Sequence, residues 1–317
     1  MALSTRWNAS RHTRGEDMIE EILDLGFERV ELGYDTRVDL VPGIRDMVRD
    51  RAVRVDSVHN YCPVPVISHR GHPEIFTLAD PDHRIRELAI QHTAHTIRFA
   101  AEIGARTVVT HCGNVRMPRL TEALIVLCGQ GQQFSGRYEK TKLKLITKRE
   151  KKSRRQLRYL YDGLERLLPV LVENGITLAL ENLPTWESLP TESEMEHMAR
   201  DFQTPHIGYW HDLGHGQIRE NLGLINHTRW LERLQPVLKG MHLHDVAPPV
   251  HDHLMPPRGK IDFSLFQSFA RLDIIRVIEP TPHTPRKDIE EGLSFLKEIW
   301  SDTENASDTT AETNKEK

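Results

Sequence analysis

Eight short runs rich in β-branched and apolar residues alternate with longer helical segments, and this alternation restricts the fold more than any other feature. The runs are ALSTRWN, FERVELG, VRVDSVHN, ARTVVTHCG, ITLALENL, HIGYWHDLG, GMHLHDV and IIRVIEP. Segments between them, such as PDHRIRELAIQHTAHTIRFAAEIG, carry apolar residues at helical spacing. Strands that alternate with helices form parallel βαβ units. Eight such units over about 300 residues predict a single (β/α)₈ TIM barrel.

An open, doubly wound α/β sheet is the alternative fold. Such a sheet normally carries a glycine-rich phosphate turn after an early strand, and no early strand here is followed by one. We therefore expect one domain over residues 1–300, followed by a disordered polar tail, SDTENASDTTAETNKEK, over residues 301–317.

A long basic insertion is expected after the fourth strand, at about residues 114–153. Eleven Lys or Arg residues and only two Glu lie between Arg137 and Arg158, although the whole chain has a net charge of −4. Such a run is more often a solvated helix or mobile insertion than a phosphate contact, so we expect no nucleic-acid partner. Long insertions also serve as lids or subunit contacts, and a homo-oligomer is expected.

The chain lacks the signals of membrane insertion or export. No apolar run approaches the roughly 18 residues of a membrane span, and the first residues lack the apolar core of a signal peptide. The three cysteines show no CxxC spacing, so no disulfide framework or thiolate zinc site is indicated. We predict a cytoplasmic protein without a membrane partner.

Metal-binding residue types end four consecutive predicted strands. They are Glu181, Asp212, His242 and Glu279, about one βα unit apart. A TIM barrel has its active site at the carboxyl ends of its strands, and strand alternation points Glu181 into the barrel, opposite Leu180. Buried carboxylates that converge without a partner would cost several kcal/mol, and a divalent cation removes that cost. The pattern therefore predicts a metal site.

Further candidate residues surround this set. Earlier strands add Glu31, His59 and His111 at equivalent terminal positions, and the segment GMHLHDVAPPVHDH adds His244, Asp245, His251 and His253. We expect His244, Asp245 and His251 to line or orient the mouth of the barrel. Strand alternation points His211 away from Asp212.

Six motifs, in order, carry a family resemblance: SVHNYCPVP, THCG, LALENLP, GYWHDLGHGQ, MHLHDV and DHLMPPRGKIDF. With them the chain resembles the sugar phosphate isomerase/epimerase family of the xylose isomerase-like TIM barrel superfamily. The resemblance implies one divalent metal ion held by Glu181, Asp212, His242 and Glu279. It further implies a sugar or keto-sugar isomerase or epimerase in which Glu181 and Glu279 move a proton through a metal-stabilised enediolate.

The resemblance also implies substrate contacts. His215, in the Asp-x-x-His motif, and Glu187, six residues after Glu181, match positions that contact sugar oxygens in the ketose 3-epimerases. A loop or helix-start carboxylate is the alternative for Glu187. We add His59, His111 and His253 as further substrate contacts and Trp7 as a stacking surface, with core packing as the alternative for Trp7.

Other functions remain open on the same residues. A keto-cyclitol or keto-sugar dehydratase would begin with the same proton abstraction. A second branch of the superfamily, the class II apurinic/apyrimidinic endonucleases, holds three zinc ions with additional histidines and an Asp-x-His pair, for which this chain offers His59, His111 and His253, with His251 in place of the Asp. A non-catalytic sugar- or partner-binding barrel is the third alternative. Two Glu, one Asp and one His suit Mn, Co or Mg, whereas added histidines favour Zn.

Overall fold

Eight parallel strands close into a barrel in the order β1-β10-β7-β6-β5-β4-β3-β2 in this computed structural model. The structure describes residues 1–301, so the tail predicted to be disordered lies, from residue 302 on, outside the described residues. The prediction of a (β/α)₈ barrel is confirmed, and each predicted strand overlaps one barrel strand. The barrel strands are β1 (Ala2–Ser4), β2 (Arg29–Leu32), β3 (Arg54–His59), β4 (Thr107–Thr110), β5 (Thr177–Glu181), β6 (Ile207–Asp212), β7 (Leu238–Leu243) and β10 (Ile275–Ile278).

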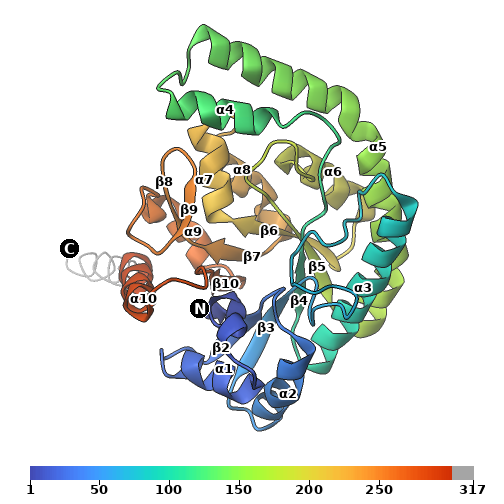
Figure 1. Cartoon of the computed structure of the whole chain (residues 1–317), viewed down its shortest axis with the longest axis vertical. Coiled ribbons are helices and arrows are strands. Elements are labelled where there is room, and N and C mark those ends of the chain that lie inside the picture. The colour runs from blue at the N-terminus through green and yellow to red at the C-terminus, as the bar shows by residue number, and fades with distance from the viewer. Residues whose placement is uncertain (302–317) are drawn as a thin grey trace, which may run out of the picture.

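Helices surround the barrel as an outer layer (Figure 1). Local signals set their ends: the Asp82 side chain accepts a hydrogen bond from the Arg84 amide at the start of α3, and Gly175 ends α5 in the left-handed region with φ of 66°. The α-helices are α1 (Gly15–Leu23), α2 (Val41–Arg49), α3 (His83–Glu102), α4 (Leu120–Gly129), α5 (Gly136–Asn174), α6 (Glu192–Phe202), α7 (Leu213–Asn221), α8 (His227–Leu234), α9 (Gln267–Ala270) and α10 (Arg286–Ser301). Short 3₁₀ turns are η1 (Thr5–Trp7), η2 (Ala9–Arg11), η3 (Val38–Leu40), η4 (Gln235–Val237) and η5 (Phe263–Phe266).

The basic segment after β4 is helical. Residues 114–153 form α4 and the first part of the 39-residue α5, which extend past the other helices at the top of Figure 1. Arg149 attaches α5 to the loop after β5, since it donates to the backbone oxygens of Trp186 and Ser188 and forms an ion pair with Glu194. Seven cations recur every three or four residues along one face of α5: Arg137, Lys140, Lys144, Lys148, Lys151, Arg155 and Arg158.

Two apolar cores support the barrel. The larger core lies between strands and helices and includes Leu178 and Leu180 of β5. The smaller core contains Ala179 and the fully buried Trp210 among its members. Strand alternation explains this division, and it confirms that Glu181, which shares a face with Ala179, points into the barrel.

A small antiparallel hairpin follows β7 and was not expected from the sequence. Its strands are β8 (Asp245–Ala247) and β9 (His251–Leu254), joined through Pro248 and Pro249. Asp245 holds the hairpin to the next loop, because its carboxylate accepts hydrogen bonds from the amides of Gly259 and Ile261. The hairpin carries His253 back over the carboxyl end of the barrel.

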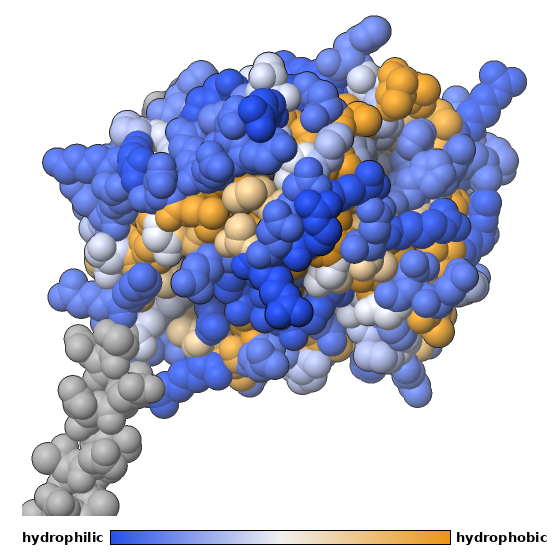
Figure 2. All heavy atoms as spheres, turned by 90° about the horizontal axis from the view of Figure 1, so that it is seen from below, coloured by the Kyte–Doolittle hydropathy of each residue, from blue (hydrophilic) through white to orange (hydrophobic). Residues whose placement is uncertain are grey.

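The face in Figure 2 is mostly hydrophilic, with apolar side chains showing in narrower bands between polar ones. Within residues 1–301, no helix combines the length and apolar character needed to cross a membrane. The cytoplasmic location stays a prediction.

Candidate metal centre

The four residues at the ends of β5, β6, β7 and β10 meet at one point, His242 Nδ1. This nitrogen lies 3.0 Å from Glu181 Oε1, 3.5 Å from Glu279 Oε2 and 3.8 Å from Asp212 Oδ2. All four side chains are buried, at most 6% exposed. The structure therefore brings together the whole set that the sequence predicts as metal ligands.

Glu31 fixes the orientation of the His242 ring through its other nitrogen, Nε2. Glu31 Oε1 lies 3.0 Å from His242 Nε2, and Ser57 donates to the other carboxylate oxygen at 2.8 Å. A carboxylate can only accept, so Nε2 carries a proton and Nδ1 is left to face the other three carboxylates. Burial disfavours the imidazolium, but Glu279, Glu31 and Glu181 outweigh it and raise the pKa of His242 well above its usual range.

The second oxygen of Glu181 contacts two more histidines. Oε2 lies 3.0 Å from His111 Nε2 and 3.2 Å from His59 Nε2. His59 Nδ1 donates to the Asn60 carbonyl, and His111 Nδ1 is buried without a hydrogen-bond partner within residues 1–301. Burial favours a neutral Glu181, but His242 and His111 hold the pKa of that carboxyl well below its usual range.

Asp212 is held by groups on three neighbouring segments. Its carboxylate accepts from the His215 amide at 2.7 Å, which caps α7, and from His244 Nε2 at 2.9 Å. Asn182 exchanges two hydrogen bonds with the Asp212 backbone and accepts one from His215 Nδ1 at its carbonyl. His215 Nε2 therefore remains available as an acceptor.

Glu279 joins the cluster to the cationic side of the mouth. Its Oε1 lies 3.3 Å from Arg6 Nη1, and its Oε2 lies 3.6 Å from His253 Nε2. Burial raises the pKa of Glu279, but His242 and Arg6 outweigh it and hold that pKa well below its usual range. Despite burial, Asp252 and Glu279 raise the pKa of His253 to about 9.

Two cavities flank the cluster and share Tyr34. One, of about 470 Å³, is lined by Tyr34, His111, His215 and Glu187 among others. The other, of about 780 Å³, is lined by Tyr34, Arg6 and further residues of the β1, β2 and β3 loops. Tyr34 also packs edge-on against His59, with ring centroids 5.2 Å apart. Tyr34 thus lies in the wall of both cavities.

The structure corrects the expectation for Trp7. The side chain is 2% exposed and belongs to the larger core, and its indole N–H donates to the Thr284 carbonyl. The Arg11 guanidinium lies 4.3 Å from its ring centroid. Trp7 lies on a short 3₁₀ turn that directs it sideways into the core, so the alternative of core packing holds and sugar stacking by Trp7 is wrong.

Glu187 lies at the cavity wall with its carboxylate already engaged. It accepts hydrogen bonds from the amides of Leu120 and Thr121 and from the Thr121 hydroxyl, and so caps α4. This is the helix-start role that the sequence left as an alternative, and its contact with substrate stays a prediction. His251, expected to line or orient the mouth, is instead exposed on β9.

Three residues at the cluster were not assigned a role from the sequence. Arg6 and Tyr34 follow the first two strands, where a systematic search of strand ends would have found them. Asn182 directly follows Glu181, and its amide hydrogen bonds depend on how β5 and β6 align. By contrast, His211 behaves as expected: it faces outward, 2.7 Å from the Tyr209 hydroxyl and 2.8 Å from His227.

A family comparison agrees with the barrel fold. Residues 19–299 match the family described as xylose isomerase-like TIM barrel. The chain belongs to this family. No curated protein matches the chain significantly.

Solved structures resemble the chain over almost its full length. An L-ribulose 3-epimerase aligns with a TM-score of 0.71 at 14% identity, covering 99% of this chain and 100% of that one. A D-tagatose 3-epimerase-like protein aligns with a TM-score of 0.67 at 18% identity, over 96% and 97% of the two chains. A 3-keto-D-glucoside 4-epimerase from E. coli has a TM-score of 0.65 at 14% identity, over 94% and 98%. At these identities the likeness establishes the fold.

Proposed function

We propose that this chain is a divalent-metal-dependent isomerase or epimerase of a sugar or keto-sugar. The observation that carries the proposal is His242 Nδ1, which faces the carboxylates of Glu181, Asp212 and Glu279 within 3.8 Å. The epimerases among similar structures, and the match to the xylose isomerase-like family, support the same reaction class.

The residues present fit a divalent cation. With Nε2 donating to Glu31, only a proton or a metal ion at Nδ1 can relieve the contact between a nitrogen lone pair and three carboxylates. Glu181, Asp212, His242 and Glu279 would hold the ion, and this donor set suits Mn, Co or Mg. When bound, the ion supplies positive charge that polarises the substrate carbonyl and stabilises the enediolate.

Glu181 and Glu279 are the proton-transfer residues in this proposal. Both carboxyl groups have pKa values held below their usual range, so both are ionised and able to accept a proton at neutral pH. One carboxylate removes the proton next to the carbonyl, and the other returns a proton that it has first taken up from solvent. Return to the same carbon from the opposite face epimerises the centre, and delivery to the neighbouring carbon isomerises the sugar.

Histidines at the cavity wall are proposed as substrate contacts. His215 presents a bare Nε2 that can accept from a sugar hydroxyl, and the cationic His253 can donate to a sugar oxygen. His59 and His111 lie on the opposite side of Glu181, beside Tyr34 and the smaller cavity. A small-molecule sugar is thus the proposed ligand, and self-association of the chain stays a prediction.

The test is carbon-bound hydrogen exchange. Purified protein with Mn²⁺ or Zn²⁺ is incubated with ketoses, keto-sugars and keto-cyclitols in deuterated water and followed by NMR. Deuterium gained next to a carbonyl supports the proposal, and the product separates epimerase from isomerase. Loss of water from the substrate instead assigns the dehydratase alternative. Absence of exchange across the panel contradicts both.

A second candidate is a zinc phosphodiesterase acting on abasic DNA. It is favoured by the additional cluster of His59, His111 and Glu181 and by the row of cations on α5. Phosphate contacts would make DNA affinity fall steeply with salt. Nicking of an abasic plasmid in the presence of zinc would support this candidate, and an intact plasmid would remove it.

A further inference from the structure

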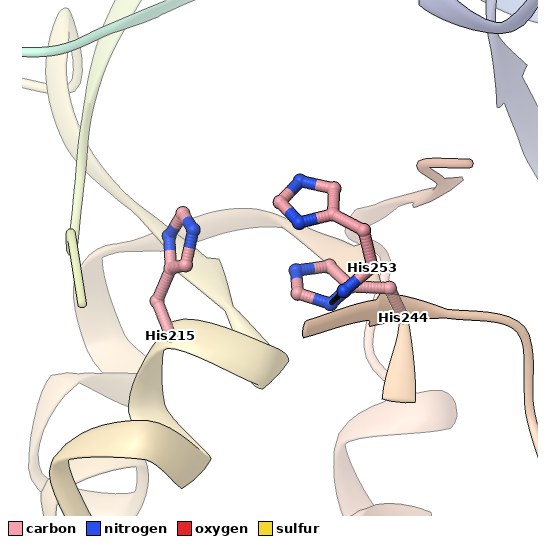
Figure 3. Close-up of side chains that lie close together, drawn as sticks. All are labelled: His215, His244 and His253. Atoms are coloured by element: carbon pink, nitrogen blue, oxygen red, sulfur yellow. Dashed lines mark hydrogen bonds between the residues drawn. The ribbon is translucent and has the colours of Figure 1, made fainter. Parts of the chain in front are cut away.

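Three histidines lie close together beside the proposed metal ligands, and their hydrogen bonds decide what they can do. His215, His244 and His253 each offer a nitrogen within 4.8 Å of the others (Figure 3). His244 and His253 stack with ring centroids 4.2 Å apart. A cluster of this kind suggests a further metal site, but a ligand nitrogen needs a free lone pair.

Both nitrogens of His244 are already engaged. The backbone N–H of His253 donates to His244 Nδ1 at 3.0 Å, the dashed line in Figure 3. Because Nδ1 accepts, the ring proton must lie on Nε2, which is 2.9 Å from Asp212 Oδ1 and 3.1 Å from Asp212 Oδ2. His244 is therefore a donor to Asp212 and has no lone pair left for a metal.

The surrounding backbone is built around this ring. Gly214, at the start of α7, lies so close that a Cβ there would stand 2.0 Å from His244 Cε1 and 2.4 Å from Nδ1. His253 adopts φ of 54°, in the left-handed region that residues other than glycine rarely occupy. Strain of this kind persists where the surrounding structure demands it, and here it aims the His253 amide at His244.

We infer that His244 is a positioning residue that holds the Asp212 carboxylate in place for the metal, and that Gly214 and the His253 backbone hold His244 itself. The inference rests on the proposed function, because it assumes that Asp212 is a ligand. In other metalloproteins, residues that hydrogen-bond to a metal ligand orient it in this way. Removing one of them typically weakens metal binding on the order of 10–100-fold.

Variants of two residues separate the possible roles of His244. His244→Met keeps an apolar side chain of similar length but removes the N–H donor. His244→Gln retains an N–H donor. Gly214→Ala leaves the His244 side chain chemically unchanged but forces its ring to move. Alanine has a higher helix propensity than glycine, so the substitution itself does not weaken α7. Gly129→Ala is the matched control, since a Cβ at this helical glycine meets nothing within 4 Å.

The measurement is the Mn²⁺ dissociation constant of each metal-free protein by isothermal titration calorimetry, with circular dichroism confirming the fold. We expect His244→Met and Gly214→Ala to weaken Mn²⁺ binding about 10–100-fold, His244→Gln to recover part of that loss, and Gly129→Ala to match the wild type. If Gly214→Ala does not fold, the comparison of Met with Gln at position 244 decides.

Three results would overturn the inference. Unchanged affinity in His244→Met would show that Asp212 needs no support from His244. Complete loss of Mn²⁺ binding in both His244→Met and His244→Gln would identify His244 as a direct ligand instead of a positioning residue. A wild-type protein that binds no divalent ion would remove the proposed function and this inference together, whereas the first two results leave the proposed function standing.

Discussion

Glu279→Gln is the substitution that separates proton transfer from folding. Gln has nearly the shape of Glu but cannot accept a proton from carbon. A positioned general base contributes on the order of 10²–10⁴-fold to the rate, so we expect exchange of the substrate C–H with solvent to fall by that factor. At about 1.4 kcal/mol per tenfold, the loss corresponds to about 3–6 kcal/mol of barrier.

The fold should survive this substitution for reasons visible at the site. Glu279 Oε1 has one cationic contact, Arg6 at 3.3 Å, and the Arg6 side chain is 20% exposed and can be rehydrated. Loss of that hydrogen-bonded pair costs about 1–3 kcal/mol, and removal of one of three clustered carboxylates offsets part of it. The variant should therefore remain folded while its exchange activity falls.

Deuterium incorporation by NMR measures the chemical step, and thermal unfolding measures the fold. Glu122→Gln serves as the control, because Glu122 lines the smaller cavity beside the cluster but pairs with Arg119 and is 57% exposed. Exchange by Glu279→Gln within about threefold of the wild type would refute the role of Glu279 as a proton-transfer residue. Loss of exchange in both variants would show that the cavity is sensitive to any change of charge.

Three further outcomes test the fold and the charges around the site. In Gly240→Ala the new Cβ would lie 2.2 Å from a buried indole ring, so we expect about 1–3 kcal/mol lower stability in urea, and an unchanged midpoint would contradict that packing. Glu187→Gln should cost about 0.5–2 kcal/mol through the weakened cap of α4, and a raised KM would in addition reveal a substrate contact. In the metal-free protein, Glu181 and Glu279 have depressed pKa values, so the stability that they contribute is present above their ordinary value of 4.5 and lost as the pH falls. The pKa of His242 is raised, so its contribution is fully present below the ordinary value of 6.5 and lost as the pH rises. The buried His211, His215 and His227 have lowered pKa values, so their neutral forms add stability as the pH rises to 6.5. The melting temperature should therefore be highest near pH 6.5, and a maximum above pH 8 would contradict these signs.

Most of the fold and of the candidate metal site could be predicted from strand periodicity and from the residues at strand ends. Alternation along ITLALENL placed Glu181 inside the barrel and Leu180 outside, as the two cores confirm. Because parallel strands end at the same rim, equal spacing of acidic and histidine side chains was enough to predict that Glu181, Asp212, His242 and Glu279 converge. The structure shows that convergence around a single nitrogen.

Contacts between distant loops could not be predicted from strand periodicity and strand ends. Glu187 caps α4 because the loop after β5 meets the segment after β4, and no local pattern indicates that meeting. Trp7 was placed at the mouth because it follows β1, whereas the 3₁₀ turn directs it into the core. The role of His244 depends on an amide nine residues later, which the hairpin of β8 and β9 folds back onto its ring.

The most direct test of the central claim is to measure solvent exchange at the carbon next to the carbonyl as a function of metal loading. Metal-free protein is titrated with Mn²⁺, and deuterium incorporation into an active ketose or keto-sugar is followed at each step. A site made by Glu181, Asp212, His242 and Glu279 predicts no exchange without metal, a rise with loading and a plateau at one ion per chain. Exchange that is independent of added metal, or that needs more than one ion per chain, would contradict it.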